Sequence, residues 1–404
     1  MNINDPTRQY IAAHASDNVA RLALHPPKDP QVDMHVALQQ IAGRQKAKEK
    51  LPEWYAAEGI LYPKRVSLEQ CSSSQTADYK ASVAEGETFA DFSGGFGVDT
   101  VAFARKFSQG IYVEPQQELC ELFCHNSKIF GINNIQVING IMEEQLGSVG
   151  AVDMIYLDPS RRDPDGRRVV SISDCTPNLL EWKSALLDKC STLMVKLSPM
   201  IDIRQTLRDL PETFAVHVVA VEGECKEAVF LLSREKASAE QGGRLCATGH
   251  GTAIVAADIV NGAVCRVETT VDAERATPPR IATALGAYLY EPNAAVMKAG
   301  ISNTVSERFR VSKVAHNTNL FTSDELREGF PGRIFHVNAV REFHPRKMAK
   351  EPLPVTSASV AVRNFPLSAE ELRKTLKIKD GDTHYLFGCT LSDNRRVVVA
   401  CSRM

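Results

Sequence analysis

Short apolar runs alternate with segments of helical apolar spacing through the middle of the chain. The runs have the length of buried strands and cover residues 88–93, 110–114, 134–139, 152–158 and 192–198. Such alternation predicts a parallel sheet covered by helices on both faces. Two further runs, 214–223 and 226–235, follow each other with only a short link, so the last strand is expected to be antiparallel. The predicted class is therefore α/β with a seven-stranded sheet.

The flanking regions divide the chain into four predicted parts. These are a helical lobe, the sheet domain, a β-rich extension and linker rich in Gly, Ala and Thr, and a compact α+β module, at residues 1–80, 81–235, 236–280 and 281–404. The prediction of a helical lobe is based on two Asp-Pro pairs, at residues 5–6 and 29–30. Each pair resembles a helix cap followed by proline at the first helical position.

Composition indicates a folded chain of more than one domain. Its 404 residues exceed what one hydrophobic core usually serves, and 44% of them are hydrophobic and 24% charged. The first residues lack the basic segment and apolar run of a secretory signal peptide. No stretch approaches the roughly 18 apolar residues of a membrane span. A cytoplasmic protein without membrane contact is therefore expected. Scattered cysteines favour reduced thiols, and no metal site is expected around Cys120 and Cys124. No pattern indicates an oligomeric state.

Charge is distributed unevenly along the chain. Residues 331–404 hold 13 Lys and Arg against 7 Asp and Glu, a formal charge of +6, whereas the rest holds 34 against 42, a charge of −8. The C-terminal end is therefore the expected site for a polyanion. The alternative is a solvated face with a chance imbalance.

A glycine-rich turn follows the first expected strand. That strand ends at Asp91, and the chain passes through the sequence SGGFG of residues 93–97 into a helix. Glycines let a ligand approach the main chain, and the N–H groups of a helix N-terminus point toward it. The second expected strand ends at Glu114, where a carboxylate can accept both hydroxyls of a ribose. This pattern predicts a nucleoside ligand.

Acidic residues around the turn favour a sulfonium nucleoside over a dinucleotide. In NAD-binding folds the third small residue of the loop permits tight packing below a pyrophosphate. Thr100 stands at that position here, and Asp99 beside it would repel phosphates. Asp91 suits the ammonium group of a methionine moiety. The expected cofactor is S-adenosyl-L-methionine, and NAD is the alternative.

Longer motifs carry a resemblance to a known family. The chain resembles the class I S-adenosylmethionine-dependent methyltransferases, particularly their RNA- and cap-modifying branch, in DFSGGFGVDTVAFA, YVEPQQELCELFCHNSKIFGI and DMIYLDPSRRD. The resemblance covers about residues 70–235 and implies a Rossmann-like methyltransferase sheet. It implies that the methionine part is held by the loop residues Asp91, Ser93, Gly95 and Gly97, and that Glu114 holds the ribose. The C-terminal part is similar to the THUMP-like domain behind such catalytic domains, in YLYEPNAAVMKAG and VAVRNFPLSAEELRKTLKIKDG.

Two further positions are expected near the cofactor. Ile141 stands where many relatives place an acid for the adenine amino group, so the backbone at Ile141 or the side chain of Glu143 would serve instead. In similar enzymes the segment entering the first strand closes over the methionine end, which makes Thr76 and Lys80 candidates for a lid. The alternative is an ordinary helix cap followed by a surface helix.

Asp158 follows the fourth expected strand, at the edge where open parallel sheets bind and react. In amino-methylating relatives this position reads acid or amide, Pro, Pro, aromatic, and its first side chain and a carbonyl accept hydrogen bonds from the target amine. Asp158 and Pro159 fit that pattern, whereas Ser160 and Arg161 depart from it. The candidate catalytic residues are Asp158, Pro159 and Arg161. Asp158 is expected to face the methyl group of the cofactor and to accept the proton, with a structural strand-end cap as the alternative.

The Asp-Pro-x-Arg form also resembles the uridine carbon-5 methyltransferases. Those enzymes need a cysteine nucleophile at the end of the fifth strand. Ser198 stands there, and a hydroxyl is far less acidic than a thiol. The predicted target atom is therefore nitrogen or oxygen. Lys196, inside the fifth strand, is expected either to pair with Asp158 or to reach the end of the sheet.

A basic loop follows the candidate catalytic residues, with arginines that bind an RNA phosphate or stack on a base. These are Arg161, Arg162, Arg167 and Arg168. The alternative is a solvated loop in which they pair with neighbouring aspartates.

These observations predict an RNA methyltransferase whose basic C-terminal module grips RNA through phosphates. A second hypothesis keeps the enzyme and changes its substrate to a protein or small molecule. A third is a non-catalytic protein that binds S-adenosyl-L-methionine.

Overall fold

The structure is a computed structural model that describes residues 3–161, 172–234, 251–344, 348, 353 and 355–404. The chain divides into two compact units, Met1–Phe214 with Lys226–Ala237, and Ala215–Cys225 with Ser238–Met404. Each unit is described separately below. Among the described residues, no helix has the length and apolar character needed to cross a membrane.

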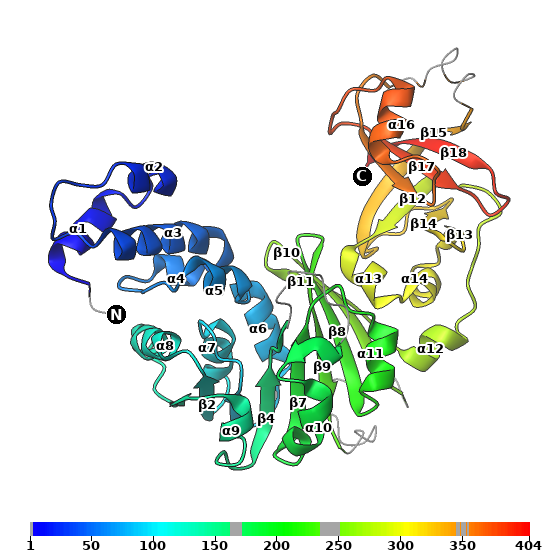
Figure 1. Ribbon diagram of the computed structural model, residues 1–404. Helices are drawn as coiled ribbons and strands as arrows, with labels where there is room; N and C mark the ends of the chain where they lie inside the picture. The colour runs from blue at the N-terminus through cyan, green and yellow to red at the C-terminus, as the bar shows by residue number, and fades with distance from the viewer. Residues whose placement is uncertain (1–2, 162–171, 235–250, 345–347, 349–352, 354) are drawn as a thin grey trace. The chain divides into compact units, whose positions relative to one another are not determined.

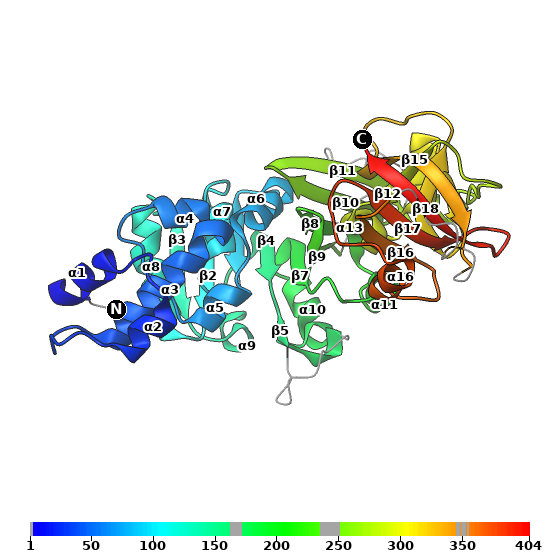
Figure 2. The same cartoon turned by 90° about the horizontal axis from the view of Figure 1, so that it is seen from above.

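The first unit begins with helices, shown in blue in Figure 1 and Figure 2. They are α1 (Asp5–Ala13), α2 (Val19–Leu24), α3 (Met34–Lys50), α4 (Pro52–Ala56), α5 (Arg65–Gln70) and α6 (Ser74–Val83). The two expected caps are displaced. Asn4, not Asp5, caps α1, and Asp33 caps α3 by accepting a hydrogen bond from Val36 N–H. Asp29 instead accepts from Gln31 N–H in a short turn, because its two-residue Asx contact competes with helix formation.

The sheet of the first unit confirms the predicted alternation. Its strands are β1 (Thr88–Asp91), β2 (Gln109–Glu114), β3 (Ile135–Asn139), β4 (Val152–Leu157), β7 (Cys190–Leu197) and β9 (Glu224–Leu232). Their order is β9-β7-β4-β1-β2-β3. All neighbours are parallel except β9, which runs antiparallel to β7. Between them lie α7 (Val98–Ala104), α8 (Gln117–Ile129), α9 (Met142–Gln145), α10 (Leu179–Leu187) and α11 (Ile203–Asp209).

The predicted α/β class is confirmed, and the sheet holds two strands more than the seven expected. The full order is β11-β10-β8-β9-β7-β4-β1-β2-β3. The strands of the second unit are β8 (Thr213–Val221), β10 (Ala253–Val260) and β11 (Ala263–Thr270). β10 pairs in parallel with β8 and forms a hairpin with β11. β10 is almost wholly buried, and its sequence is apolar except for Asp258.

The second unit continues with a separate, mostly antiparallel sheet, and the described residues of this region also form four helices. Its order is β13-β14-β12-β15-β18-β17-β16. The strands are β12 (Tyr288–Pro292), β13 (Ser312–Ala315), β14 (Thr318–Ser323), β15 (Gly332–Glu342), β16 (Ser359–Arg363), β17 (Tyr385–Thr390) and β18 (Arg396–Arg403). These helices are α12 (Val271–Ala276), α13 (Ala294–Ala299), α14 (Ser302–Phe309) and α16 (Ala369–Leu376).

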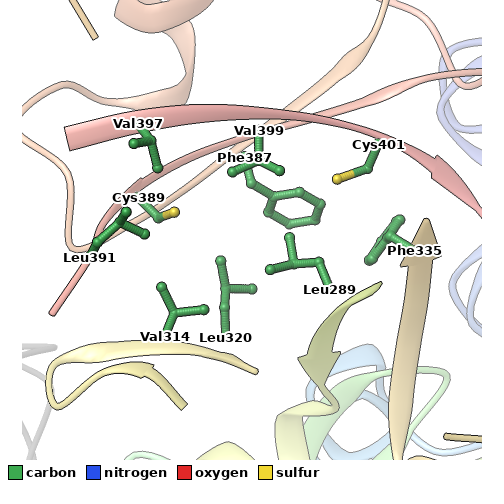
Figure 3. Packing of buried hydrophobic residues seen from close by; sticks show 10 residues of the cluster. All are labelled: Leu289, Val314, Leu320, Phe335, Phe387, Cys389, Leu391, Val397, Val399 and Cys401. Carbon is green, nitrogen blue, oxygen red and sulfur yellow. The ribbon is translucent and has the colours of Figure 1, made fainter. Parts of the chain in front are cut away.

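A hydrophobic cluster packs on one face of this second sheet (Figure 3). Val397, Val399 and Cys401 lie two residues apart along β18, so their side chains share that face. They lie near the rings of Phe335 and Phe387, whose centroids are 4.9 Å apart in an edge-to-face arrangement. Val398 and Ala400, which alternate with them, belong to a second buried cluster, so β18 is covered on both faces and the module has its own core.

Candidate active site

Three strands of the first unit end at one edge of its sheet with an acid in or just after the strand. β1 ends at Asp91 and β2 at Glu114, while Asp158 follows β4. β1 pairs in parallel with both β2 and β4. The carboxyl ends of these strands are therefore neighbours, which is the place where open α/β sheets bind ligands.

Asp91 is buried and organises the start of the glycine loop. One carboxylate oxygen accepts hydrogen bonds from Ser93 N–H and Ser93 Oγ, at 2.8 and 3.0 Å. The other accepts from Thr100 Oγ1 at 2.6 Å. Burial raises the pKa of Asp91 to about 7, and the nearby charge of Asp99 acts in the same direction, although the hydrogen bonds from Thr100 and Ser93 oppose it. A small change in surroundings therefore decides whether this acid is charged near neutral pH.

Glu114 reaches the same loop from the neighbouring strand. Its carboxylate accepts a hydrogen bond from Gly95 N–H and another from Gln116 N–H, both at 2.9 Å. Gly95 lies two residues after Ser93, the partner of Asp91. The two acids named by the sequence thus converge on one short stretch of backbone.

The glycines of the loop serve two different purposes. A Cβ on Gly94 would lie 2.3 Å from the ring of Tyr112, and one on Gly97 would lie 2.2 Å from the ring of Phe123. Those two rings stack on each other with centroids 4.2 Å apart. Gly94 and Gly97 are therefore required by packing against β2 and α8, whereas a Cβ on Gly95 would meet nothing closer than 3.6 Å. Gly95 is the position of the loop that is open to a ligand.

This difference predicts unequal effects of two alanine substitutions. Gly97→Ala should lower the free energy of unfolding by about 2–4 kcal/mol, because φ is +87° there and the new methyl group overlaps Phe123. Gly95→Ala should cost only about 1 kcal/mol, because φ is +54° but the space is open. Urea denaturation followed by circular dichroism measures both. Equal losses in the two variants would contradict the assignment of Gly97 to packing.

The N-terminal helices support the loop from outside the sheet. Phe96, between the glycines, is buried with its ring centroid 4.6 Å from that of Trp54 in α4 and 6.4 Å from that of Tyr62. Tyr62 in turn donates a hydrogen bond to the carbonyl of Trp54. Asn126 of α8 exchanges hydrogen bonds with the backbone of Leu61 at both its N–H and its carbonyl. The helical region is therefore packed onto the candidate site.

Asp158 lies beside the loop and is paired with a lysine. Its N–H donates to Ser93 Oγ at 2.8 Å, which ties the end of β4 to the loop after β1. Its carboxylate forms an ion pair with Lys196 Nζ of β7. Pairing with Asp158 was one of the two expectations for Lys196. The side chain of Asp158 is 32% exposed and that of Lys196 is 12% exposed. Asp158 thus reaches solvent, while its partner remains mostly covered.

A buried cluster of charges lies next to this pair. Lys80 of α6, whose side chain is 0% exposed, lies 2.6 Å from Glu227 of β9 and 3.2 Å from Asp99 of α7, measured from Nζ to a carboxylate oxygen. Asp99 also accepts hydrogen bonds from Ser72 Oγ at 2.7 Å and from Tyr156 OH at 3.0 Å. The alternative that Lys80 lies on a surface helix is therefore wrong, because its side chain is enclosed and paired with acids of α7 and β9. Sequence reasoning missed Glu227, whose only signal is an acid directly before the apolar run of β9.

The other predicted positions have more varied settings. Thr76 lies in the first turn of α6, where its N–H is capped by Ser73 Oγ and its hydroxyl donates to the Ser73 carbonyl. Ile141 is an exposed residue at the N-terminus of α9, directly after β3. Pro159 is buried. Ser160 and Arg161 form a short strand, β5, paired with β6 (Cys175–Thr176). The remaining arginines of the basic loop lie outside the described residues: Arg162, Arg167 and Arg168.

Comparison with known proteins gives matches in the C-terminal region and over the full length. Residues 288–331 match a ferredoxin-like domain family, and residues 332–403 match a THUMP domain-like family. A crystal structure described as a "putative methyltransferase from Porphyromonas gingivalis W83" is 31% identical, covers 100% of both chains and has a TM-score of 0.86. No curated protein sequence matches the chain.

Shorter structural matches are also found. An rRNA methylase from Streptococcus thermophilus is 16% identical, covers 39% of this chain and 93% of its own, and has a TM-score of 0.29. A structure described as a "putative methyltransferase from streptococcus mutans in complex with SAH" is 12% identical over 39% of this chain and 96% of its own, with a TM-score of 0.29. Of these matches, the full-length one shows the family relationship. The predicted resemblance of the C-terminal part to THUMP-like domains is confirmed. The chain belongs to the methyltransferase family of the Porphyromonas gingivalis protein, with a ferredoxin-like and a THUMP-like domain in its C-terminal part.

Proposed function

We propose that this protein is an S-adenosyl-L-methionine-dependent methyltransferase that modifies a nitrogen or an oxygen of an RNA nucleotide. The observation that carries the proposal is the convergence of Asp91 and Glu114 on the backbone of Ser93 and Gly95. It places two acids and one open glycine at the strand ends of a methyltransferase-type sheet.

The residues present fit this cofactor. Gly95 leaves room beside the main chain, Asp91 supplies negative charge for a methionine ammonium group, and Glu114 supplies acceptors for a ribose. The backbone near Ile141, exposed after β3, would border the adenine. When bound, the cofactor supplies a sulfonium methyl group for transfer to a nucleophile.

The residues around Asp158 support transfer to nitrogen or oxygen and not to an unreactive carbon. Ser198 follows β7, where carbon-5 chemistry needs a thiolate. Cys71 interacts electrostatically with Asp99 and Lys196, but burial raises the pKa of its thiol to about 11, so it stays protonated. Asp158 is left as the group that orients the nucleophile and accepts its proton.

Two observations support RNA as the substrate. Residues 331–404 carry 13 Lys and Arg against 7 Asp and Glu, and residues 332–403 match a THUMP domain-like family. A basic α+β module is suited to contacts with phosphates, whose binding weakens as salt is added. Arg161, with the arginines that follow it, would contact a phosphate close to the reacting nucleotide.

Cofactor binding should depend on pH through Asp91. Its pKa of about 7 means that below pH 7 the acid must lose a proton before it can pair with the cationic cofactor, so affinity rises with pH. We expect S-adenosyl-L-methionine to bind up to about tenfold more weakly at about pH 6 than at about pH 8. Isothermal titration calorimetry measures this change. Asp91→Asn should bind weakly with no such dependence, and absence of binding by the wild-type protein at millimolar cofactor would reject the proposal.

A further inference from the structure

The ion pair of Asp158 and Lys196 offers a reacting group two complementary partners. The carboxylate of Asp158 accepts hydrogen bonds only, and the ammonium of Lys196 donates only. The two groups touch each other, and Asp158 is the more exposed of the pair. A nucleophile that approaches Asp158 from solvent therefore meets an acceptor with a cation directly beside it.

Three neighbouring carboxylates keep Lys196 charged. Burial alone would lower the pKa of Lys196, but the carboxylates of Asp158, Asp99 and Glu227 hold the pKa well above its ordinary value. Lys80 fixes Asp99 and Glu227 in place at 3.2 and 2.6 Å. Lys196 is thus a permanent cation at the strand ends and serves as a hydrogen-bond donor, not as a base.

The nucleophiles of a nucleotide differ in how they satisfy such a pair. An exocyclic amino group has protons for Asp158 but no free lone pair in its plane for Lys196. A ring nitrogen has either a lone pair for Lys196, as adenine N1 and guanine N7 do, or a proton for Asp158, as guanine N1 and uracil N3 do, but never both. A hydroxyl has one donor and two acceptor lone pairs, so it satisfies both groups at once. The aromatic residue that amino-methylating relatives place after the prolines is also replaced here, by Arg161.

We infer that the target atom is a hydroxyl oxygen, which in RNA is the ribose 2′-hydroxyl. This inference rests on the proposed function and selects between its two target atoms. The hydroxyl donates to Asp158 and accepts from Lys196. Its oxygen forms the new bond to the methyl carbon as the bond between that carbon and sulfur breaks, and the proton passes to the Asp158 carboxylate. Lys196 stabilises the negative charge that develops on the oxygen. The products are a ribose methyl ether, S-adenosylhomocysteine and a protonated Asp158.

The experiment identifies the methylated part of the nucleotide. Total RNA from cells of the source organism that lack the gene is incubated with the full-length protein and S-adenosyl-L-methionine labelled in its methyl group. The RNA is digested to nucleosides, and mass spectrometry of their fragments separates a methyl group on the ribose from one on the base. We expect the label on the ribose.

Variants of the two lysines connect the product to the site. Lys196→Met should reduce labelling by roughly 10²–10³-fold while cofactor binding persists, because the charge on the oxygen loses its partner. Lys196→Arg should restore part of the rate because the charge returns. Lys183→Met is the matched control and should keep wild-type labelling. Lys183, in α10, also pairs with an acid, Glu212, at 2.9 Å.

Each outcome separates the inference from the proposed function. Label on a base overturns the inference and leaves the proposed function standing. Ribose labelling that Lys196→Met does not change overturns the role of Lys196. Absence of label in RNA, with cofactor binding confirmed by calorimetry, rejects RNA as the substrate and the inference with it.

Discussion

Lys80→Met is expected to lower the free energy of unfolding by about 3–5 kcal/mol. Lys80 has no exposed side-chain surface and is the common partner of Glu227 and Asp99. Methionine fills a similar volume but removes the cation that contacts both carboxylates in the interior. Removal of one member of a buried ion pair costs more than the pair itself contributes, because the remaining charge stays desolvated. Urea denaturation of the full chain at neutral pH, followed by circular dichroism, measures the loss.

Two controls distinguish this effect from a general sensitivity to lysine substitution. Lys64→Met removes a pair with Glu118 in which both side chains are largely exposed, so its effect should be within about 1 kcal/mol. The double variant Lys80→Met, Glu227→Gln should recover part of the loss, because the buried negative charge is removed with its partner. A loss for Lys80→Met no larger than that for Lys64→Met would show that the cluster is open to water.

The main sheet and its acids were predictable because their signals are local. Alternation of apolar runs with helical segments specifies a parallel sheet, and parallel strands bring their carboxyl ends to one edge. Asp91 and Glu114 each end a strand, so their position at one edge was predictable, whereas their contacts with Ser93 and Gly95 depend on the conformation of the loop. The glycines predicted a turn, but the sequence does not show which of them are required by packing. The rings that require Gly94 and Gly97 come from β2 and α8.

The charged cluster could not be predicted because it joins distant parts of the chain. Lys80 and Glu227 are 147 residues apart, and each lies in an element whose sequence suggests another environment. The N-terminal segment was expected to close over the methionine end, but sequence spacing does not show that Ser72 and Lys80 would meet Asp99. The two additional strands, β10 and β11, lie in the predicted β-rich extension, whose Gly- and Thr-rich sequence does not show which sheet it joins.

Asp158→Asn is expected to lower the rate of methyl transfer by about 10²–10⁴-fold at saturating cofactor. The amide keeps the shape of the side chain and can still accept a hydrogen bond, but it cannot take the proton that the nucleophile must lose. It also removes the counter-charge of Lys196. The rate is measured as transfer of labelled methyl groups to RNA, and calorimetry with S-adenosylhomocysteine reports separately on cofactor binding.

Ser160→Ala is the matched control for this variant. Ser160 is exposed two residues further along the chain, and its hydroxyl donates only a long hydrogen bond, of 3.3 Å, to the Thr176 carbonyl among the contacts of the described residues. Its loss should leave the rate close to that of the wild type. If Asp158→Asn retained a rate within about tenfold of the wild type, Asp158 would be a structural cap of β4, and the proton would have to leave through another group. Catalysis by Asp158 is expected because of its position. Of the three acids at the strand ends, it is the one whose side chain is substantially exposed, so a nucleophile from solvent reaches it before Asp91 or Glu114.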